Sequence, residues 1–355
     1  MRRLLARGVD ALLEATVVLS FSRIGYRVRR RLARWTALDS YRLQGRVILV
    51  TGATSGIGFA TAEQLASCGA TVVLLGRDRE RTEAARERIL QTTGNEAVTT
   101  LIADMADTAA VRRAASEFRS RFERLDVLVH NAGALVHTHT LTSSGVEITA
   151  AGQLIGPFLM TGLLLDLLVR SAPARVITVA SGGMYAVPLS VDALVSGRGP
   201  GEEEFRGPKQ YARVKRAQVT LNELWSERLP RRDVFFHSMH PGWVDTPGLT
   251  EALPRFYRLI RPIVRTPAQG ADTIAWLASD DGVPLSSSGR FWLDRRPRAT
   301  HWLWKRRRRE PAEERRRLWD FCMTHSGWSG DVDSVVEVAR AVRRARAGSA
   351  ASFED

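Results

Sequence analysis

The chain has 355 residues, of which 44% are hydrophobic, a fraction that excludes wholesale disorder and allows a sizeable core. Its two cysteines, Cys68 and Cys322, are too few for a disulfide framework or a cysteine-rich metal site, so we expect a reducing, cytoplasmic setting. The formal net charge of +14 lies mainly at two ends, +7 over residues 1–35 and +7 over residues 290–320, and this distribution argues against a groove for DNA.

The N-terminal region, residues 1–43, is predicted to be a basic amphipathic extension. Residues 9–21 (VDALLEATVVLSF) contain Asp10 and Glu14 and are too short to span a bilayer, which needs about 20 apolar residues. Residues 22–35 mix apolar side chains with arginines. Two interpretations stay open: a helix packed on the main domain with its arginines in water, or peripheral contact with an anionic membrane surface.

Short apolar runs alternate with helical patterns from residue 46 onward. The runs are β-branched and bounded by Gly, Asp or Pro, which is typical of buried strands. Their alternation with helices predicts an α/β fold, a Rossmann-type doubly wound parallel sheet in a single domain over residues 44–295. A basic, partly helical C-terminal extension follows over residues 296–355. The predicted strands are residues 46–50, 70–76, 97–104, 126–133, 174–181 and 234–240.

Two segments interrupt this rhythm, residues 182–207 and 245–268. The second contains four prolines and cannot form one continuous helix. Both follow predicted strands, so they should lie above the carboxyl edge of the sheet, where open α/β sheets bind ligands. Their length favours a lid or substrate-binding role over a plain surface connection.

The first predicted strand runs directly into TGATSGIG, residues 51–58, and then into a helix. Glycines allow a tight turn and close approach to a pyrophosphate, and the helix N-terminus favours its negative charge. A glycine-rich loop alone is a weak signal, but its position after the first strand makes it a strong one. The candidate cofactor-binding residues of this loop are Gly52, Ser55, Gly56, Ile57 and Gly58.

The residues at the end of the second predicted strand indicate which of the two nicotinamide cofactors, NAD(H) or NADP(H), the site prefers. Sites for NAD usually place an acidic residue there, whereas this chain has Gly76 followed by Arg77. An arginine can pair with a 2′-phosphate, so NADP(H) is favoured over NAD(H). The alternative is that Arg77 is one more exposed arginine in an arginine-rich chain.

Several motifs occur in an order that resembles the short-chain dehydrogenases/reductases. They are TGATSGIG, HNAG (130–133), Ser181, YARVK (211–215) and HPGWVDT (240–246). The resemblance covers roughly residues 44–295. Other stretches, such as RVITVASGGM, resemble one branch of this family whose substrates are poorly defined.

The pair Tyr211 and Lys215 fits the proton transfer that accompanies hydride transfer at a carbonyl. The ordinary pKa of tyrosine, about 10, is too high for an efficient base near neutral pH. A lysine four residues later lies on the same helical face, where its charge favours the phenolate. The resemblance makes Tyr211 the general acid/base and Lys215 its tuner and cofactor clamp. It makes Ser181 a hydrogen-bond donor to the substrate oxygen. The alternative for the pair alone is a solvated helical turn.

The resemblance also assigns residues with less chemical justification of their own. Relatives place an asparagine, which pins a water in a proton relay, at the position of Gln153, and this longer side chain either keeps the relay or displaces the water. The remaining expected cofactor contacts are Asp104, Met105, Asn131, Ala132, Gly133, Val244 and Thr246.

Two other site types have little support. His137 and His139 project to opposite sides of an extended segment and lack a further ligand, so no metal site is expected. The run KRRRR (305–309) lies close to Trp302 and Trp304, but no recognisable nucleic-acid-binding motif surrounds it, so no nucleic-acid partner is expected.

The sequence therefore predicts an NADP(H)-dependent oxidoreductase that interconverts an alcohol and a carbonyl of a small molecule. A non-catalytic NADP(H)-binding sensor or docking module stays open as the alternative, supported only by Gln153. Relatives often form homo-oligomers through the helices near Gln153 and Tyr211, and the resemblance leaves this open here. Apolar residues of the two interrupting segments suggest a lipophilic substrate; they are Tyr185, Val187, Leu189, Leu249, Leu253, Phe256 and Tyr257.

Overall fold

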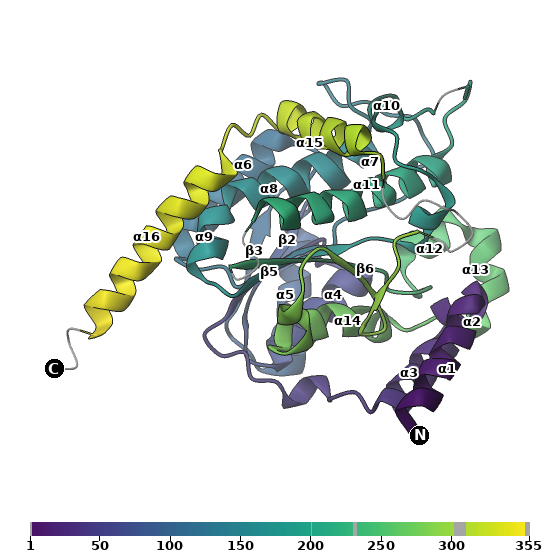
Figure 1. Ribbon diagram of the computed structural model, residues 1–355, viewed down its shortest axis with the longest axis horizontal. Helices are drawn as coiled ribbons and strands as arrows, with labels where there is room; N and C mark the ends of the chain where they lie inside the picture. Colours follow the sequence, from purple (N-terminus) through teal and green to yellow (C-terminus); the bar gives the residue numbers. More distant parts are fainter. Residues whose placement is uncertain (1, 200, 230–232, 302–309, 352–355) are drawn as a thin grey trace.

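The computed structural model describes residues 2–199, 201–229, 233–301 and 310–351. Within these residues, eight strands form one sheet in the order β3-β2-β1-β4-β5-β6-β7-β8 (Figure 1). All neighbours pair in parallel except β7 and β8. The predicted doubly wound parallel sheet is confirmed. The strands are β1 (Val47–Thr51), β2 (Thr71–Gly76), β3 (Val98–Ile102), β4 (Val127–His130), β5 (Ala174–Val179), β6 (Val234–Met239), β7 (Arg290–Leu293) and β8 (Arg296–Arg298).

Helices cover both faces of the sheet (Figure 1). Successive side chains of a strand point to opposite faces, so Val47 and Leu49 of β1 join one core and Ile48 and Val50 join the other. Burial on both sides explains why the strands are almost continuously apolar. One face carries α4 (Gly56–Ser67), α5 (Arg79–Thr93) and α14 (Pro267–Ser279), and the other carries α6 (Thr108–Arg121), α8 (Gly156–Leu163), α9 (Leu165–Arg170) and α11 (Gly207–Arg228).

The segments that interrupt the alternation contain short helices. In residues 182–207 these are a 3-10 turn, Gly182–Ala186, and α10 (Val191–Ser196). In residues 245–268, α12 (Pro247–Ala252) and α13 (Pro254–Ile260) each begin at a proline, followed by the 3-10 turn Arg261–Ile263. The prediction that no continuous helix spans this segment is confirmed.

Strands β7 and β8 were not predicted. Strand β7 has four residues, three of them apolar and buried, and β8 has three residues, two of them arginines, so both are shorter than a typical buried apolar run. They are joined by Asp294 and Arg295, both in the left-handed region with φ of 54° and 55°. Turns of this geometry usually contain glycine or asparagine. Because neither residue occurs here, no turn signal for this hairpin is visible in the sequence.

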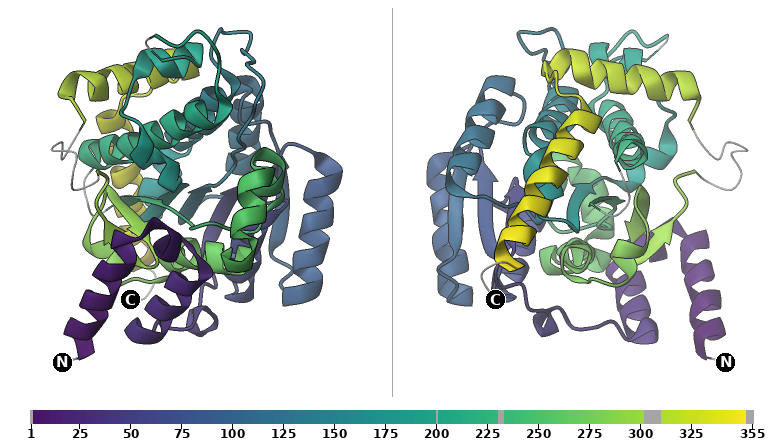
Figure 2. Two further views of the ribbon diagram at one scale, coloured as in Figure 1. Left: turned by 90° about the vertical axis from the view of Figure 1, so that its right-hand side faces the viewer. Right: turned by 60° about the vertical axis from the view of Figure 1, so that its left-hand side comes forward.

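The N-terminal extension forms three helices, α1 (Arg2–Ala15), α2 (Val17–Phe21) and α3 (Arg23–Ala33), beside the β7–β8 hairpin (Figure 2). A 3-10 turn, Leu38–Ser40, leads into β1. The helices pack on the main domain, but the expectation that all their arginines lie in water is wrong for Arg29, which is buried in ion pairs with Asp10 and Asp294. Among the described helices, none has both the length and the apolar character needed to cross a bilayer.

The C-terminal region adds α15 (Ala312–Ser326) and α16 (Val332–Ala351). Helix α15 lies over α11 and α8, and the Trp319 ring centre is 4.8 Å from that of Trp225 and 5.1 Å from that of Phe158. Leu318 and Trp319 of α15 are both buried. The KRRRR run at 305–309 lies outside the described residues.

Candidate functional site

The glycine-rich loop after β1 has a backbone shape that requires glycine. Gly52 and Gly56 are left-handed, with φ of 65° and 55°. At Gly58 a Cβ atom would lie 2.2 Å from the Gly52 carbonyl oxygen and 2.3 Å from Nδ2 of Asn131. Helix α4 begins at Gly56, so its free N–H groups face this loop. The loop offers the close approach and partial positive charge that a pyrophosphate needs, with Ser55 exposed just before the helix and Ile57 half-buried.

Asn131 ties the ends of β1 and β4 together. Its Nδ2 donates to the carbonyl oxygens of Thr51 at 3.0 Å and Gly52 at 3.1 Å. The hydroxyl oxygen of Thr51 accepts the N–H groups of Asn131 and Ala132, both at 3.0 Å. Ala132 and Gly133 are thereby held beside the glycine loop.

Ser181, Tyr211 and Lys215 meet at the carboxyl end of β5. Nζ of Lys215 lies 5.2 Å from the centre of the Tyr211 ring and donates a 2.9 Å hydrogen bond to the carbonyl oxygen of Val179. Ser181, two residues beyond Val179, shares a hydrogen bond with Tyr211, and its Oγ accepts the N–H of Gly183 at 3.2 Å. The structure thus brings together the three residues that the sequence singled out.

Gln153 lies in a π-helical turn, Ala151–Ile155, which connects the short α7 (Ile148–Ala150) to α8. Its Nε2 donates to the carbonyl oxygen of Ala134 at 2.8 Å. Its own main-chain carbonyl accepts from Nε2 of Gln218 at 2.7 Å. The side chain is therefore directed at the end of β4, beside Gly133, and Gln218 binds its main-chain oxygen.

The loop after β6 reaches the glycine loop. A methyl carbon of Thr246, Cγ2, would lie 3.1 Å from a Cβ atom at Gly56. The Thr246 hydroxyl oxygen accepts the N–H of Leu249 at 3.3 Å and caps α12. Val244 is buried and pairs with Arg265 in an isolated bridge. Thr246 therefore lies beside Gly56 of the glycine loop, and its contact with a cofactor stays a prediction.

The residues expected near the adenosine end lie at the ends of β2 and β3. Arg77 follows β2, is exposed, and has no ion-pair partner among the described residues. Asp104 is exposed after β3, and its Oδ1 accepts the N–H of Ala106 at 2.9 Å. Met105 beside it is buried. Arg77 and Asp104 are therefore accessible to a ligand at this edge.

Comparisons with known proteins decide the family. Residues 46–190 match the short chain dehydrogenase family. The chain is 40% identical over 273 residues to dehydrogenase/reductase SDR family member 12 of Homo sapiens, covering 77% of this chain and 84% of the relative. The chain belongs to the short chain dehydrogenase family. The branch suggested by the sequence motifs is that of this relative, and the resemblance is confirmed.

Other members of the family are also similar over most of the chain. Retinol dehydrogenase 11 of Homo sapiens is 31% identical over 295 residues, with 82% of this chain and 89% of that protein covered. Among solved structures, a short chain dehydrogenase from Burkholderia cenocepacia in complex with NADP is 25% identical with a TM-score of 0.58. The match covers 70% of this chain and 96% of that one.

Burial governs the ionisation of the two titratable residues of this dehydrogenase site. It raises the pKa of Tyr211 to about 12, although the hydrogen bond with Ser181 acts in the lowering direction. It lowers the pKa of Lys215 to about 7. Lys215 can therefore change its protonation near neutral pH, while in the chain by itself Tyr211 stays a proton donor.

Gln218 and Thr51 were missed by sequence reasoning, although both carried a signal. Gln218 is seven residues after Tyr211 and three after Lys215, a spacing that puts it on the same helical face. Thr51 is the first residue of the TGATSGIG motif. Thr51 holds the backbone of Asn131 and Ala132, and Gln218 holds the main-chain oxygen of Gln153.

Some of the apolar residues that were expected to line the substrate site do not face it. Leu189 is buried in the core, so it cannot face a substrate. The Tyr185 hydroxyl donates to the carbonyl oxygen of Ala299, and the Tyr257 hydroxyl donates to Asp245. Val187, Leu249, Leu253 and Phe256 remain partly exposed.

The two histidines of the VHTHT stretch contact main-chain oxygens. Nε2 of His137 lies 2.8 Å from the carbonyl oxygen of Ala252, and Nε2 of His139 lies 2.9 Å from that of Ser196.

Proposed function

We propose that this dehydrogenase interconverts an alcohol and a carbonyl with NADP(H) as cofactor. The observation that carries the proposal is the grouping of Ser181, Tyr211 and Lys215 at the end of β5, in the same sheet edge as the glycine loop. A nicotinamide dinucleotide fits this edge. Glycine is sterically required at Gly58, and the positively polarised end of α4 faces the loop.

In this proposal the chain's own residues control the proton and the substrate oxygen. When bound at this edge, NADPH would supply the hydride for the carbonyl carbon. Tyr211 donates its phenolic proton to the substrate oxygen, and Ser181 donates a hydrogen bond to the same atom. A protonated Lys215 then stabilises the phenolate that remains. Gln153 keeps the end of β4 in place beside Gly133 through its bond to Ala134.

The substrate class proposed is a lipophilic carbonyl or alcohol. Support comes from the partly exposed Val187, Leu249, Leu253 and Phe256 on the segments above the sheet edge. The test is NADPH consumption with aldehydes and ketones of rising lipophilicity. Activity that rises with chain length supports the proposal, and equal or falling activity contradicts the lipophilic part of it. No turnover with any member would contradict the enzymatic part.

Arg77 is expected to select NADPH over NADH. Its exposed guanidinium follows β2, where it can pair with the 2′-phosphate. Replacing Arg77 with alanine should weaken NADPH binding by about 10- to 100-fold, the loss of one charged hydrogen-bonded contact, and leave NADH binding unchanged. Dissociation constants for both nucleotides check this. The control is Arg113→Ala on α6, which removes the same charge from a side chain 73% exposed. Equal weakening by both variants would show a general charge effect.

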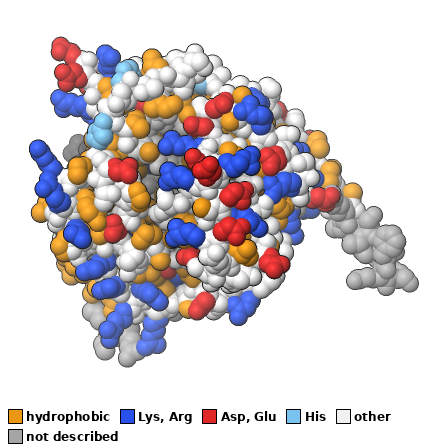
Figure 3. All heavy atoms as spheres, turned by 180° about the vertical axis from the view of Figure 1, so that it is seen from behind, with side chains coloured by type: hydrophobic (Ala, Val, Ile, Leu, Met, Phe, Trp, Pro, Cys, Tyr) orange, Lys and Arg blue, Asp and Glu red, His pale blue; other side chains and the backbone are white. Residues whose placement is uncertain are grey.

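The N-terminal helices are proposed to contact an anionic membrane surface. Leu12, Val18 and Ile24 are 71%, 52% and 42% exposed. Exposed arginines, among them Arg23 and Arg27, lie on the same segment. Figure 3 shows basic and hydrophobic side chains outnumbering acidic ones at its lower left, where these helices lie. A surface of this kind suits anionic lipid because it joins apolar contact to charge attraction.

Vesicle co-sedimentation checks this surface. The intact chain should sediment with phosphatidylcholine vesicles that contain phosphatidylserine and much less with phosphatidylcholine alone. The double variant Leu12→Asp, Val18→Asp should lose most of this binding. Val338→Asp, Val342→Asp is the matched control, because both valines lie on α16 and are 65% and 37% exposed. Binding that is the same for the double variant and the control would overturn the proposed surface.

A further inference from the structure

The loop after β6, residues 240–246, is fixed by the backbone of Arg265. The N–H of Arg265 donates to the carbonyl oxygen of Trp243 at 2.7 Å, and the N–H of Asp245 donates to the carbonyl oxygen of Arg265 at 2.8 Å. These two bonds surround Val244, and Thr246 follows directly. The position of Thr246 against the glycine loop therefore depends on Arg265.

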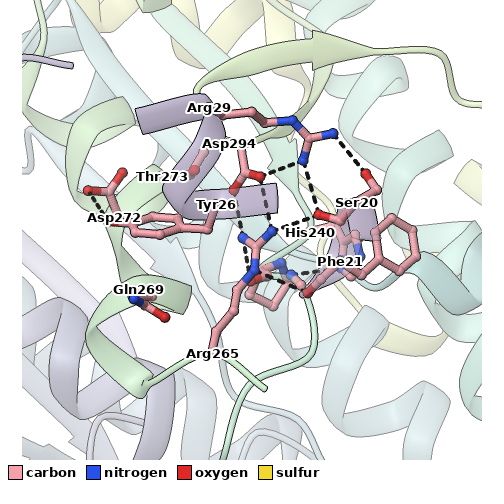
Figure 4. A network of polar contacts seen from close by, with 12 residues as sticks. Ser20, Phe21, Tyr26, Arg29, His240, Arg265, Gln269, Asp272, Thr273 and Asp294 are labelled. Atoms are coloured by element: carbon pink, nitrogen blue, oxygen red, sulfur yellow. Dashed lines mark hydrogen bonds and ion pairs between the residues drawn. The ribbon is translucent and has the colours of Figure 1, made fainter. Parts of the chain in front are cut away.

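The side chain of Arg265 binds the N-terminal segment. Its guanidinium donates to the carbonyl oxygen of Ser20 at 2.9 Å and of Phe21 at 3.1 Å. It also pairs with Asp294 through two hydrogen bonds, of 2.6 and 3.0 Å (Figure 4). Arg29 of α3 donates to the same carboxylate at 2.6 Å. Arg265 and Asp294 are each 1% exposed, so these contacts are shielded from water and from salt.

Phe21 touches both loops of the candidate site. Its carbonyl oxygen accepts the N–H of Trp243 at 2.8 Å, and its ring lies edge-on to His240 with the ring centres 4.2 Å apart (Figure 4). Its ring atom Cε2 would lie 2.6 Å from a Cβ atom at Gly182, the residue after Ser181. The end of α2 is thus packed between the Ser181 loop and the loop that carries Thr246.

These contacts form one continuous path from the N-terminal helices to the cofactor-binding edge. We propose that the N-terminal segment is a part of the catalytic unit, in which Phe21 and Arg265 are positioning residues for the 240–246 loop. They hold Val244 and Thr246 at the glycine loop and so set the affinity for the nicotinamide cofactor. This inference rests on the proposed function insofar as that loop is taken to contact the cofactor.

Two buried apolar residues of the N-terminal segment provide the test. Phe21→Ala removes the ring that contacts the loops, whereas Leu13→Ala removes a side chain of α1 that packs near Val9 and Leu32, within the N-terminal helices. Both variants of the full chain should unfold at a lower temperature. Phe21→Ala alone should also weaken NADPH binding, by about tenfold or more in a fluorescence titration, because a small displacement of a positioning loop has a large effect. Phe21→Tyr, which keeps the ring, should restore the affinity.

The outcomes separate this inference from the proposed reaction. Wild-type NADPH affinity in Phe21→Ala, or equal weakening in Leu13→Ala, would overturn the positioning role. The dissociation constant of NADPH is measured without any carbonyl substrate, so the positioning role can be tested even if the chain has no activity. A chain that binds NADPH but reduces no carbonyl would contradict the proposed reaction and would leave the positioning role to be decided by the affinities of the variants. If Phe21→Ala does not fold, Phe21→Leu, which keeps the apolar volume but not the ring, takes its place in the same comparison.

Discussion

Replacing Tyr211 with phenylalanine is expected to lower turnover by about 10²- to 10⁴-fold, the usual contribution of a general acid/base. The ring is retained, so its contacts with Lys215 and the packing of α11 are preserved. Only the hydroxyl that hydrogen-bonds Ser181 and would protonate the substrate oxygen is lost. Steady-state kinetics should show the loss in kcat, while a fluorescence titration shows NADPH binding close to that of the wild type.

Tyr41→Phe is the matched control for this prediction. It removes a hydroxyl that donates to Asp280 at 2.8 Å, far from the catalytic group, and should leave kcat unchanged. Turnover that survives in Tyr211→Phe would exclude this tyrosine as the proton donor. A wild-type chain that binds NADPH and turns over no carbonyl would favour the sensor or docking module instead.

Replacing Asp294 with asparagine is expected to lower the free energy of unfolding by about 3–5 kcal/mol. The carboxylate neutralises two buried guanidinium groups, those of Arg29 and Arg265. Burial by itself raises the pKa of Asp294, but the two arginines outweigh it and hold the pKa below its ordinary value. Asparagine keeps the size and tolerates the left-handed φ of 54°, so the effect reports on the charge. Urea unfolding at pH 7 measures it.

Asp192→Asn is the surface counterpart. Asp192 pairs with Arg317 on an exposed face, and such pairs contribute only about 0–1 kcal/mol. A loss below about 1 kcal/mol in Asp294→Asn would mean that water or other groups replace the carboxylate, contrary to the burial of this cluster. The two variants together compare a buried and an exposed carboxylate in one chain.

The sequence predicted the part of the fold that depends on local pattern. Six parallel strands are recognisable in the sequence as apolar runs because both faces of each strand are buried. The spacing of four residues from Tyr211 to Lys215 places both side chains on one helical face. The glycine loop was found because Gly52 and Gly56 adopt backbone shapes that other residues avoid. These features are determined within a few residues of the chain.

The parts that sequence reasoning missed depend on contacts between distant residues. Arg265 looked like one of many arginines, yet its side chain binds carbonyl oxygens some 240 positions earlier. Asp294 and Arg29, separated by 265 positions, carried no pattern that pairs them. Leu189 was expected at the substrate because its segment is a loop, but loops also contribute side chains to the core. The periodic patterns of helices and strands carry no information about such long-range pairs.

Helix α15 has a consequence for quaternary structure. It covers α8 and α11 and contacts the turn that contains Gln153, which is the surface through which relatives were expected to associate. Trp319 fills the space between Phe158 and Trp225, and Arg228 stacks on its outer face with its guanidinium carbon 3.8 Å from the ring centre. Helix α15 thus gives α8 and α11 an apolar cover from within the same chain. A dimer built through these helices would first have to displace that cover.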